Sequence, residues 1–329
     1  MRVELPGLFD LQVNGFAGVD FNGPGLTVER VELALEQLRA TGVTRCLPTL
    51  ITSSITDFAR NARVFSAVRH PAIAGIHMEG PYLSTEEGAR GAHPPEHLLP
   101  AYRDDFDLRQ GAAGGLIRLV TLAPEVPGAL SLIEHLTASG VRVAIGHTTA
   151  SPATIADAIA AGATLATHVG NGCAQVLPRH PNVIWEVLAA DALFASLIVD
   201  GHHLPPSTVK AMVRAKGAER TILVTDAVAA AGCAPGTYTI GGTRSVLGED
   251  GRVSLPGTPY LAGSSLLLND AVANTVRFTG LPLAQAAAMA STIPAAYLGT
   301  STLGRLSAEW DADACTLRIL EVRPDESSR

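Results

Sequence analysis

Four ionisable residues each stand at the end of a short apolar run, and their types suit metal-assisted hydrolysis. Glu79 ends the run AGIHME and Asp226 ends TILVTD, while His147 and His168 end RVAIGH and TLATH. A carboxylate and two imidazoles are three ligands that suit zinc, with a fourth position left for water. With one anionic ligand the metal keeps enough positive charge to bring the pKa of that water toward roughly 7.

Asp226 is the candidate for the proton transfers of such a hydrolysis. It would take the proton of the attacking water and later deliver it to the leaving amine. Each residue also has a structural interpretation, because a lone His at a strand end is more often a hydrogen-bonded structural residue. Their joint occurrence on separate runs favours one divalent metal held by Glu79, His147 and His168. Zinc suits this set best, and iron, manganese or cobalt are alternatives.

The first apolar run carries polar residues of another kind. Asp10, Gln12 and Asn14 alternate along LFDLQVN and therefore share one face of a strand. Gln12 and Asn14 are poor zinc ligands beside imidazole, so we expect no second metal there. Two interpretations stay open for them: hydrogen bonding in a pocket, or a structural role.

The elements that must position these residues form a repeating pattern. Eight apolar runs alternate with segments of helical periodicity, several of which begin with Ser, Thr or Pro and end with Gly. The runs span residues 8–14, 44–50, 74–80, 116–122, 142–148, 164–171, 194–201 and 221–227. Strands separated by helices pair in parallel, so eight units predict a (β/α)8 TIM-type barrel with its active site at the C-terminal strand ends. The alternative is a doubly wound open sheet. That fold would need a glycine-rich phosphate loop after its first strand, which VNGFAGVD matches only loosely.

The pattern changes after the eighth run. Residues 237–255 alternate with period two around Asp250-Gly251, which predicts a β-hairpin excursion over about 236–262. One last helix is expected over 281–299. We therefore expect a barrel over 1–304, followed by a C-terminal segment over 305–329. That segment contains a strand in DADACTLRILEV and the polar ending PDESSR.

Composition restricts the class of protein. The chain has 329 residues, of which 47% are hydrophobic and 17% charged, and the formal net charge is −7. That charge offers no basic face for nucleic acid, and no run of about 18 apolar residues predicts a membrane span. The start MRVELPGLFDLQ does not resemble a signal peptide. The four cysteines lack C-x-x-C spacing, so we expect reduced thiols in a cytoplasmic protein.

The motifs, read in order, resemble those of a known family. PGLFDLQVNGFAGVDFN, LPTLITSS, GIHMEGPYLS, GHTTA, ATHVGN, IVDGHH, LVTDA and LAGSSL resemble the sequence blocks of N-acetylglucosamine-6-phosphate deacetylases. The resemblance runs from about Pro6 to Gly304. HMEGP, GHT, THVGN and VTDA in this order are specific to that family, and a Gln-x-Asn in the first strand also occurs in its single-metal members.

The resemblance implies an activity. It implies hydrolysis of the acetamide of an amino-sugar phosphate to acetate and the free amine, in a barrel of the amidohydrolase superfamily. Glu79, His147 and His168 match the metal ligands of the family, and Asp226 matches its catalytic acid/base. The chemistry agrees, because a metal and a histidine can together polarise the amide carbonyl.

The resemblance also implies substrate contacts. The matching positions are Asn171, Gly172, Arg179, His203 and His93. Arg179 matches the arginine that meets the phosphate, in that family often across a homodimer interface, and a guanidinium can grip phosphate with two hydrogen bonds. His202 stands beside His203 and is the alternative for its role. A solvated loop residue is the structural alternative for Arg179, and structural histidines are the alternative for His93 and His202.

The sequence departs from the family in two places. Family members usually begin with strands that join the C-terminal strands in a small β-domain, whereas here the first barrel strand follows directly after Met1 to Leu5. We therefore expect a reduced or missing small β-domain and a tail without its usual partners. The loop GCAQVLPRHPN also replaces an Ala-Met-containing segment. Two alternatives follow: an amidohydrolase for another amide or cyclic amide, or a non-catalytic barrel that binds a sugar phosphate.

Overall fold

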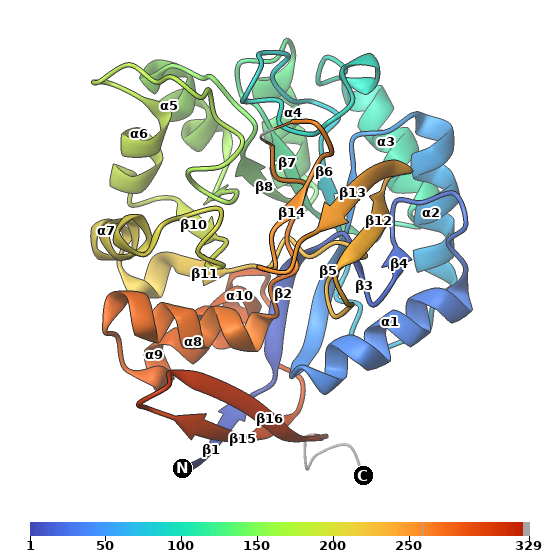
Figure 1. Cartoon of the computed structure of the whole chain (residues 1–329). Coiled ribbons are helices and arrows are strands. Elements are labelled where there is room, and N and C mark those ends of the chain that lie inside the picture. Colours follow the sequence, from blue (N-terminus) through green and yellow to red (C-terminus); the bar gives the residue numbers. More distant parts are fainter. Residues whose placement is uncertain (259, 325–329) are drawn as a thin grey trace.

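A sheet of eight parallel strands forms the centre of the molecule (Figure 1). The computed structural model describes residues 1–258 and 260–324, so nearly all of the expected polar ending lies outside the described residues. In sheet order the strands are β2 (Leu8–Val13), β5 (Val43–Ile51), β6 (Ile76–Glu79), β7 (Ile117–Leu122), β8 (Arg142–Ile145), β9 (Leu165–Ala166), β10 (Phe194–Leu197) and β11 (Thr221–Leu223). These are the eight expected runs, and the (β/α)8 prediction is confirmed.

The sheet closes between its first and last strands. Val13, the last residue of β2, forms a parallel bridge with Ala227, which follows β11. The backbone N–H of Asp226 donates to the carbonyl of Gln12 at 3.0 Å, and that of Asn14 donates to the carbonyl of Ala227 at 2.7 Å. A doubly wound open sheet has no such seam, so that alternative was wrong. Closure also places Asp226 directly beside the first strand.

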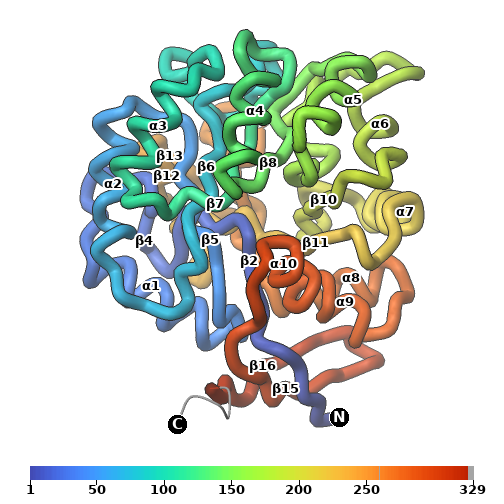
Figure 2. Tube along the Cα trace, turned by 180° about the vertical axis from the view of Figure 1, so that it is seen from behind, coloured from blue at the N-terminus to red at the C-terminus, as the bar shows by residue number. Residues whose placement is uncertain are grey.

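Helices surround the barrel on its outside (Figures 1 and 2). They are α1 (Val28–Ala40), α2 (Ile55–Ala67), α3 (Arg103–Ala112), α4 (Ala129–Ala138), α5 (Pro152–Ala161), α6 (Val183–Ala189), α7 (Pro206–Lys216) and α8 (Leu268–Thr279), with short 3-10 turns at Pro95–His97 and Ala218–Arg220. The side chains of Thr27, Ser54 and Ser151 cap α1, α2 and α5 as their positions predicted. Among the described residues, no helix has the length and hydropathy that a membrane crossing requires.

The single helix expected over 281–299 was wrong, because two short helices replace it. They are α9 (Leu283–Met289) and α10 (Thr292–Tyr297). Pro294 has no N–H and its ring would clash with the carbonyl of Ala290, so one continuous helix cannot form. The Ala290 carbonyl instead accepts a hydrogen bond from the N–H of Phe9 at 2.8 Å, which ties this break to the first barrel strand.

The excursion after the eighth barrel strand is a three-stranded antiparallel ribbon. It consists of β12 (Gly236–Ile240), β13 (Thr243–Leu247) and β14 (Val253–Ser254). The expected centre at Asp250-Gly251 was wrong for the main hairpin, which turns at Gly241 and Gly242 with φ of 57° and 82°. A two-residue turn with both φ values positive favours glycine, whereas the Asp250-Gly251 turn serves only the short pairing of β13 with β14.

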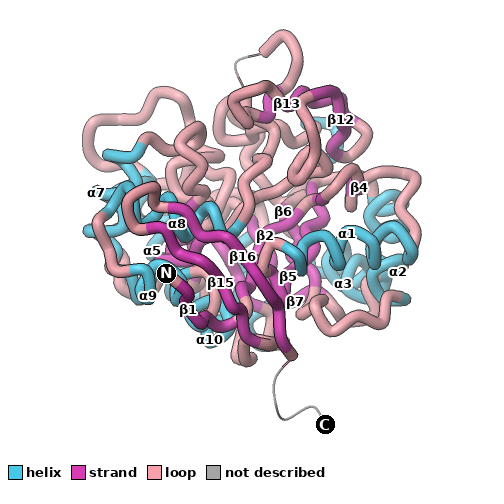
Figure 3. The backbone as a smooth tube through the Cα atoms, turned by 60° about the horizontal axis from the view of Figure 1, so that its bottom comes forward, coloured by secondary structure: helices cyan, strands magenta, loops and turns pink. Residues whose placement is uncertain are grey.

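A small sheet lies apart from the ribbon, at the front of Figure 3. Its order is β1 (Arg2–Pro6), β15 (Arg305–Asp311) and β16 (Thr316–Arg323), all antiparallel. The expectation that the tail lacks partners was therefore wrong, because β15 pairs with both β1 and β16. Leu306, Ala308 and Trp310 alternate inward along β15, a period-two signal that the sequence contained. The short strand β3 (Gly15–Phe16) pairs with β4 (Val19–Asp20) beside the barrel.

Candidate active site

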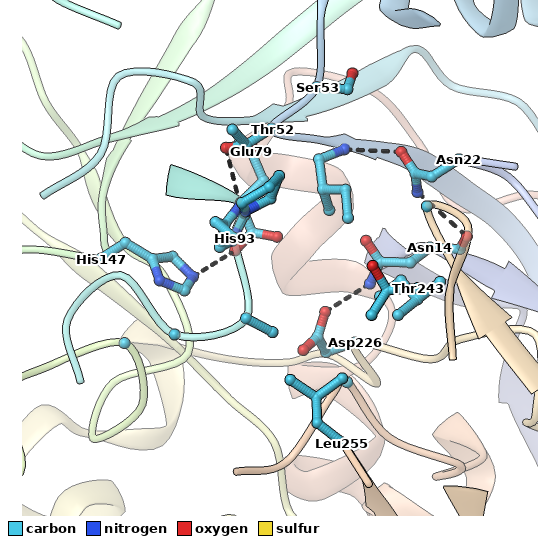
Figure 4. Close-up of a pocket in the computed structure, with 18 of the residues that line it drawn as sticks. Asn14, Asn22, Thr52, Ser53, Glu79, His93, His147, Asp226, Thr243 and Leu255 are labelled. Atoms are coloured by element: carbon cyan, nitrogen blue, oxygen red, sulfur yellow. Dashed lines mark hydrogen bonds and ion pairs between the residues drawn. The ribbon is translucent and has the colours of Figure 1, made fainter. Parts of the chain in front are cut away.

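Three buried side chains from three strand ends converge at one mouth of the barrel. Glu79 is the last residue of β6, and His147 and His168 each follow their strand, β8 and β9, by two residues. The Oε1 atom of Glu79 lies 2.9 Å from Nε2 of His168 and 3.2 Å from Nε2 of His147. One ligand atom from each residue lies within 4.8 Å of the others. Figure 4 shows two of the three, Glu79 and His147. This is the cluster predicted from the strand ends.

The residues that follow the strands have an unusual backbone conformation. His147, His168 and Asp226 have φ of 51°, 29° and 53°, in the left-handed region that residues with a Cβ seldom adopt. Each such residue costs of order 1–3 kcal/mol and persists only where its surroundings fix it. The chain therefore leaves the extended conformation sharply at the end of these strands.

Hydrogen bonds hold the two histidine turns in place. The hydroxyl of Ser196 accepts the N–H of His168 at 2.8 Å, and the N–H of Ser84 donates to the carbonyl of His147 at 3.0 Å. The carboxylate of Glu125 accepts both the N–H of Thr149 at 2.7 Å and the hydroxyl of Thr148 at 2.5 Å. Strand β10 and the loops after β6 and β7 thus supply the contacts that hold these turns.

Asp226 is held by the two amides of the first strand. Its Oδ1 atom accepts the Nδ2 of Asn14 at 2.7 Å and the Nε2 of Gln12 at 3.1 Å. The same Nε2 of Gln12 lies 3.1 Å from Oε1 of Glu79. Of the two interpretations left open for Gln12 and Asn14, hydrogen bonding within the site is the one observed. Within the described part of the chain, no hydrogen bond uses the Oδ2 atom of Asp226.

Burial and mutual contacts shift the pKa values of these groups. Burial opposes ionisation of Glu79, but the hydrogen bonds from His147 and His168 outweigh it and hold the pKa of Glu79 well below its ordinary value. Burial disfavours the charged form of His168, yet its hydrogen bond to Glu79 wins and raises the pKa of His168. Burial, and then the charge of Glu79, raise the pKa of Asp226 to about 6. In the metal-free site, Asp226 therefore holds its proton more tightly than an exposed aspartate does.

The three side chains fit a divalent metal. An anionic oxygen and two imidazole nitrogens are a donor set used for zinc and similar ions, and here they point at one another while buried. Within the described residues, Glu79, His147 and His168 are the single group of at least three possible metal ligands found close together. The amides of Gln12 and Asn14 are occupied by Asp226. The site therefore fits one metal rather than two.

A cavity of about 540 Å³ opens above these side chains. Four of the five predicted substrate contacts line it: Asn171, Gly172, His203 and His93. Asn171 donates from Nδ2 to the carbonyl of His168 at 3.2 Å. A Cβ at Gly172 would lie 2.9 Å from Nδ1 of His147 on a backbone with positive φ, so only glycine fits there.

The two adjacent histidines 202 and 203 are separated by the fold. His203 lines the cavity, and its Nδ1 lies 2.6 Å from Oδ2 of Asp200. His202 is exposed, and its Nε2 contacts the carbonyl of Asp250 at 3.1 Å. Of the two histidines, His203 is therefore the one at the cavity, and its contact with substrate stays a prediction. His93 is buried beside the metal ligands, with its ring centre 4.4 Å from that of His147.

Arg179 is not brought to the cavity of its own chain. Its side chain is exposed and does not line the cavity. It lies in the loop before α6, where the side chain of Asn182 contacts its carbonyl at 3.5 Å. Its role in phosphate binding stays a prediction, and it requires a second chain.

Several cavity residues were not anticipated. Asn22 anchors one wall by donating from Nδ2 to the carbonyl of Thr49 at 3.0 Å and accepting the N–H of Ile51 at 2.9 Å. Thr243 lines the cavity from the ribbon, as does Tyr260 from the segment after it. Asn22 stands in the VDFN motif, which offered a signal. The ribbon residues offered no such signal, because a local hairpin pattern does not indicate that the hairpin will fold over the cavity.

The fold and the site together define a class of protein. A closed parallel barrel carries a metal-ligand cluster and an adjacent carboxylic acid at the C-terminal ends of its strands, where barrel enzymes do their chemistry. A protein of this class is a metal-dependent barrel hydrolase.

Comparison with known proteins gives the particular family. Residues 3–324 match the amidohydrolase family. The chain is 34% identical to the N-acetylglucosamine-6-phosphate deacetylase of Bacillus subtilis, over 94% of this chain and 79% of the relative. It is 35% identical to the N-acetylgalactosamine-6-phosphate deacetylase of a Shewanella species, over 93% and 77%. The chain therefore belongs to the N-acetylglucosamine-6-phosphate deacetylase family of amidohydrolases.

Solved structures agree with this assignment. The N-acetyl-D-glucosamine-6-phosphate deacetylase of Mycobacterium smegmatis superposes with a TM-score of 0.90 at 31% identity, covering 98% of this chain and 86% of that one. An alanine mutant of the same enzyme, in complex with N-acetyl-D-glucosamine-6-phosphate, gives a TM-score of 0.89 at 30% identity, with 97% and 86% covered. The similarity thus includes the barrel, the ribbon and the small sheet of this chain.

Proposed function

We propose that this chain hydrolyses the acetamide of N-acetylglucosamine 6-phosphate, or of a close N-acyl amino-sugar phosphate, to acetate and the free amine. One observation carries the proposal: Glu79, His147, His168 and Asp226 meet at one mouth of the barrel. The relatives act on both glucosamine and galactosamine derivatives. Amino-sugar phosphates are therefore the substrate class, and the sugar itself is a matter for assay.

The proposed roles follow from the geometry. A divalent metal held by Glu79, His147 and His168 would supply Lewis acidity, which activates water and polarises the amide carbonyl. Asp226 accepts the proton of the attacking water at Oδ2, since its Oδ1 is engaged by Asn14. The same oxygen then delivers that proton to the amine nitrogen as the C–N bond breaks.

His203 is the proposed second donor to the substrate carbonyl. Asp200 engages its Nδ1 at 2.6 Å, which leaves Nε2 free to act toward the cavity. An oriented imidazole donor aimed at developing negative charge lowers the barrier to amide attack. Burial lowers the pKa of His93 to about 3, so His93 stays neutral and serves as a hydrogen-bonding wall.

We assign one zinc ion per chain to the metal site, with iron, manganese or cobalt as alternatives that the same donor set accepts. Within the described residues all four cysteines are free. Free thiols and a phosphorylated substrate are consistent with a cytoplasmic enzyme.

Phosphate recognition points to a second copy of the chain. Among the described residues that line the cavity, Arg60 is the one arginine or lysine, and it is already paired with Asp57 at 2.5 Å. A doubly negative phosphate needs another cation. We propose that Arg179 supplies it across a homodimer interface. Its loop also exposes Val176, whose surface is 88% accessible, which a partner would cover.

Acetate release from N-acetylglucosamine 6-phosphate, with and without a chelator, tests the proposal. We expect turnover that the chelator abolishes and one equivalent of divalent metal restores. N-acetylgalactosamine 6-phosphate, the unphosphorylated sugars and a panel of cyclic amides are assayed in parallel. Activity found only on another amide would show that the proposed substrate class, amino-sugar phosphates, is wrong. Binding of the sugar phosphate without turnover would favour the non-catalytic barrel.

A further inference from the structure

One buried carboxylate beneath the site has no part in the roles assigned so far. Asp10 lies on β2 with no exposed surface and does not line the cavity. Its Oδ2 accepts the hydroxyl of Thr225 at 2.6 Å. Its Oδ1 accepts the backbone N–H of Thr225 at 3.3 Å and that of Gln12 at 3.1 Å. Two of its three hydrogen bonds therefore go to a single residue, 215 positions away in the chain.

Thr225 transmits this contact to its neighbour. It directly precedes Asp226, and its hydroxyl oxygen also accepts the N–H of Ala227 at 3.0 Å. One hydroxyl group thus links Asp10 to the peptide unit that follows Asp226. Asp226 needs such support, because its φ of 53° lies in the strained left-handed region.

Closing the barrel does not by itself account for Asp10. The seam is already formed by backbone hydrogen bonds from Asp226 to Gln12 at 3.0 Å and from Asn14 to Ala227 at 2.7 Å. Burial of a carboxyl group is costly, and here it raises the pKa of Asp10 to about 7. The hydrogen bonds of Asp10 go to Thr225, the residue before the acid/base, and to the backbone N–H of Gln12. The buried carboxylate therefore acts on the position of Asp226.

We infer that Asp10 is a positioning residue for Asp226 and acts through the hydroxyl of Thr225. The inference deepens the proposed function and rests on it, because it concerns the proton transfers of that reaction. A small rotation at residue 226 would move its Oδ2 away from the reacting atoms. Catalysis is sensitive to displacements of about 1 Å, so the rate should fall while substrate binding is kept.

Thr225→Val tests the inference, because valine keeps the shape of threonine and lacks the hydroxyl. We expect kcat to fall about tenfold or more, with KM within about twofold and the metal content unchanged. Thr225→Ser restores the hydroxyl and should return kcat to within about threefold of wild type. In Asp10→Asn the side-chain NH2 must face either the Thr225 hydroxyl or the two backbone N–H groups that Asp10 accepts, so this variant should lower kcat as Thr225→Val does.

Thr44→Val is the matched control. Thr44 is also buried, and its hydroxyl donates to the carbonyl of Leu8 on the same first strand at 3.3 Å, at the other end of the barrel. Thr225→Val should lose more thermal stability than Thr44→Val, because its hydroxyl has the closer partners, Asp10 at 2.6 Å and Ala227 at 3.0 Å. With both variants folded at the assay temperature, only Thr225→Val should lose kcat. Equal kcat in the two variants, or a Thr225→Val loss that appears in KM or metal content, would overturn the inference.

Two outcomes need separate interpretation: an unfolded Thr225→Val variant and an inactive wild-type protein. If Thr225→Val does not fold, Asp10→Asn and Thr225→Ser decide: unchanged kcat in Asp10→Asn refutes the inference, and a selective loss supports it. If the wild-type protein with metal releases no acetate, the proposed function fails, and the inference about this reaction fails with it. An active wild type with unaffected Thr225 and Asp10 variants removes the inference alone.

Discussion

The Nδ2 atom of Asn14 lies 2.7 Å from the Oδ1 atom of Asp226. This hydrogen bond joins the first barrel strand to the acid/base that follows the last one, across the seam of the barrel (Figure 4). Because Gln12 donates to the same oxygen at 3.1 Å, one carboxylate oxygen is fixed and the other is left for proton transfer. The side-chain amides of Gln12 and Asn14 thus occupy the positions where a second metal would need ligands.

Asn14→Leu should lower kcat by about tenfold with little change in KM. Leucine has a similar volume and cannot donate, so the Asp226 carboxylate loses one of the two hydrogen bonds that orient it. Steady-state kinetics with acetate detection provides the measurement. Asn61→Leu removes another buried asparagine, on α2, and serves as the control for general damage. A change confined to KM would contradict the orienting role.

Asp226→Asn should keep the fold and the metal and lose at least about 100-fold in kcat, because the variant cannot accept and return a proton. Its Oδ1 can still accept the hydrogen bond from Asn14. Kinetics combined with elemental analysis of the metal checks the prediction. Asp57→Asn, at the rim of the same cavity, is the matched control. Full activity in Asp226→Asn would refute its assigned role.

Removal of the metal should lower thermal stability as well as activity. A metal at about 1,000 times its Kd stabilises the folded state by roughly 4 kcal/mol, if it binds only that state. Glu79→Gln should bind metal weakly and melt near the temperature of the chelated wild type, with no further effect of chelator. Glu86→Gln, an exposed change in the nearby loop, should behave as wild type. A Glu79→Gln protein with a full equivalent of metal would contradict the ligand assignment.

Arg179→Ala should raise KM for the phosphorylated substrate by about tenfold or more, because a charged, bidentate phosphate contact is lost. The unphosphorylated sugar should be affected far less. Arg214→Ala, an exposed arginine on α7, is the control. Equal losses on both substrates would remove Arg179 from the phosphate site.

A mixing experiment tests whether Arg179 acts on the partner's substrate. Hybrid dimers of Arg179→Ala and Asp226→Asn subunits contain one site with both residues intact. We therefore expect activity at low substrate concentration to exceed the sum of the two separate variants. No recovery after verified subunit exchange would show that Arg179 does not act across the interface.

The stability of the metal-free protein should depend on pH through Asp10. Burial raises the folded-state pKa of Asp10 to about 7 from the ordinary value of 3.8, so the folded state binds the proton more tightly than the unfolded state. The stabilisation present below about pH 4 is therefore lost as pH rises to about 7. Urea unfolding of wild type and Asp10→Asn at both ends of this window measures it. The wild type should lose more stability with rising pH than the variant, and parallel curves would contradict the prediction.

The sequence alone predicted the barrel and the residues at its mouth. An apolar run followed by a single ionisable residue is a local pattern, and eight such runs separated by helices can close in few ways. Parallel pairing then brings all C-terminal strand ends to one side. Glu79, His147, His168 and Asp226 could be grouped for that reason, although no two of them are close in the chain.

Some errors arose where local signals were weak or ambiguous. The strand Arg2–Pro6 is too short to be predicted from its residue pattern. Its pairing with Arg305–Asp311 depends on segments from the two ends of the sequence meeting in the fold. Both Gly241-Gly242 and Asp250-Gly251 suit a tight turn, so the residue types do not say which dipeptide lies at the centre of the main hairpin. Pro294 gave a usable signal for the break between α9 and α10, which the apolar pattern of the segment obscured.

Only the tertiary structure decided how the site is held. The contacts of Asp226 with Asn14, and of Asp10 with Thr225, join residues more than 200 positions apart. They exist because the first and last strands meet in one register when the barrel closes. That His203 lines the cavity while His202 does not is likewise decided by tertiary packing. Residue type and local spacing determined which groups are present at the strand ends. The register of the closed sheet determined which atoms touch, because hydrogen bonds require distances near 3 Å that no local pattern specifies.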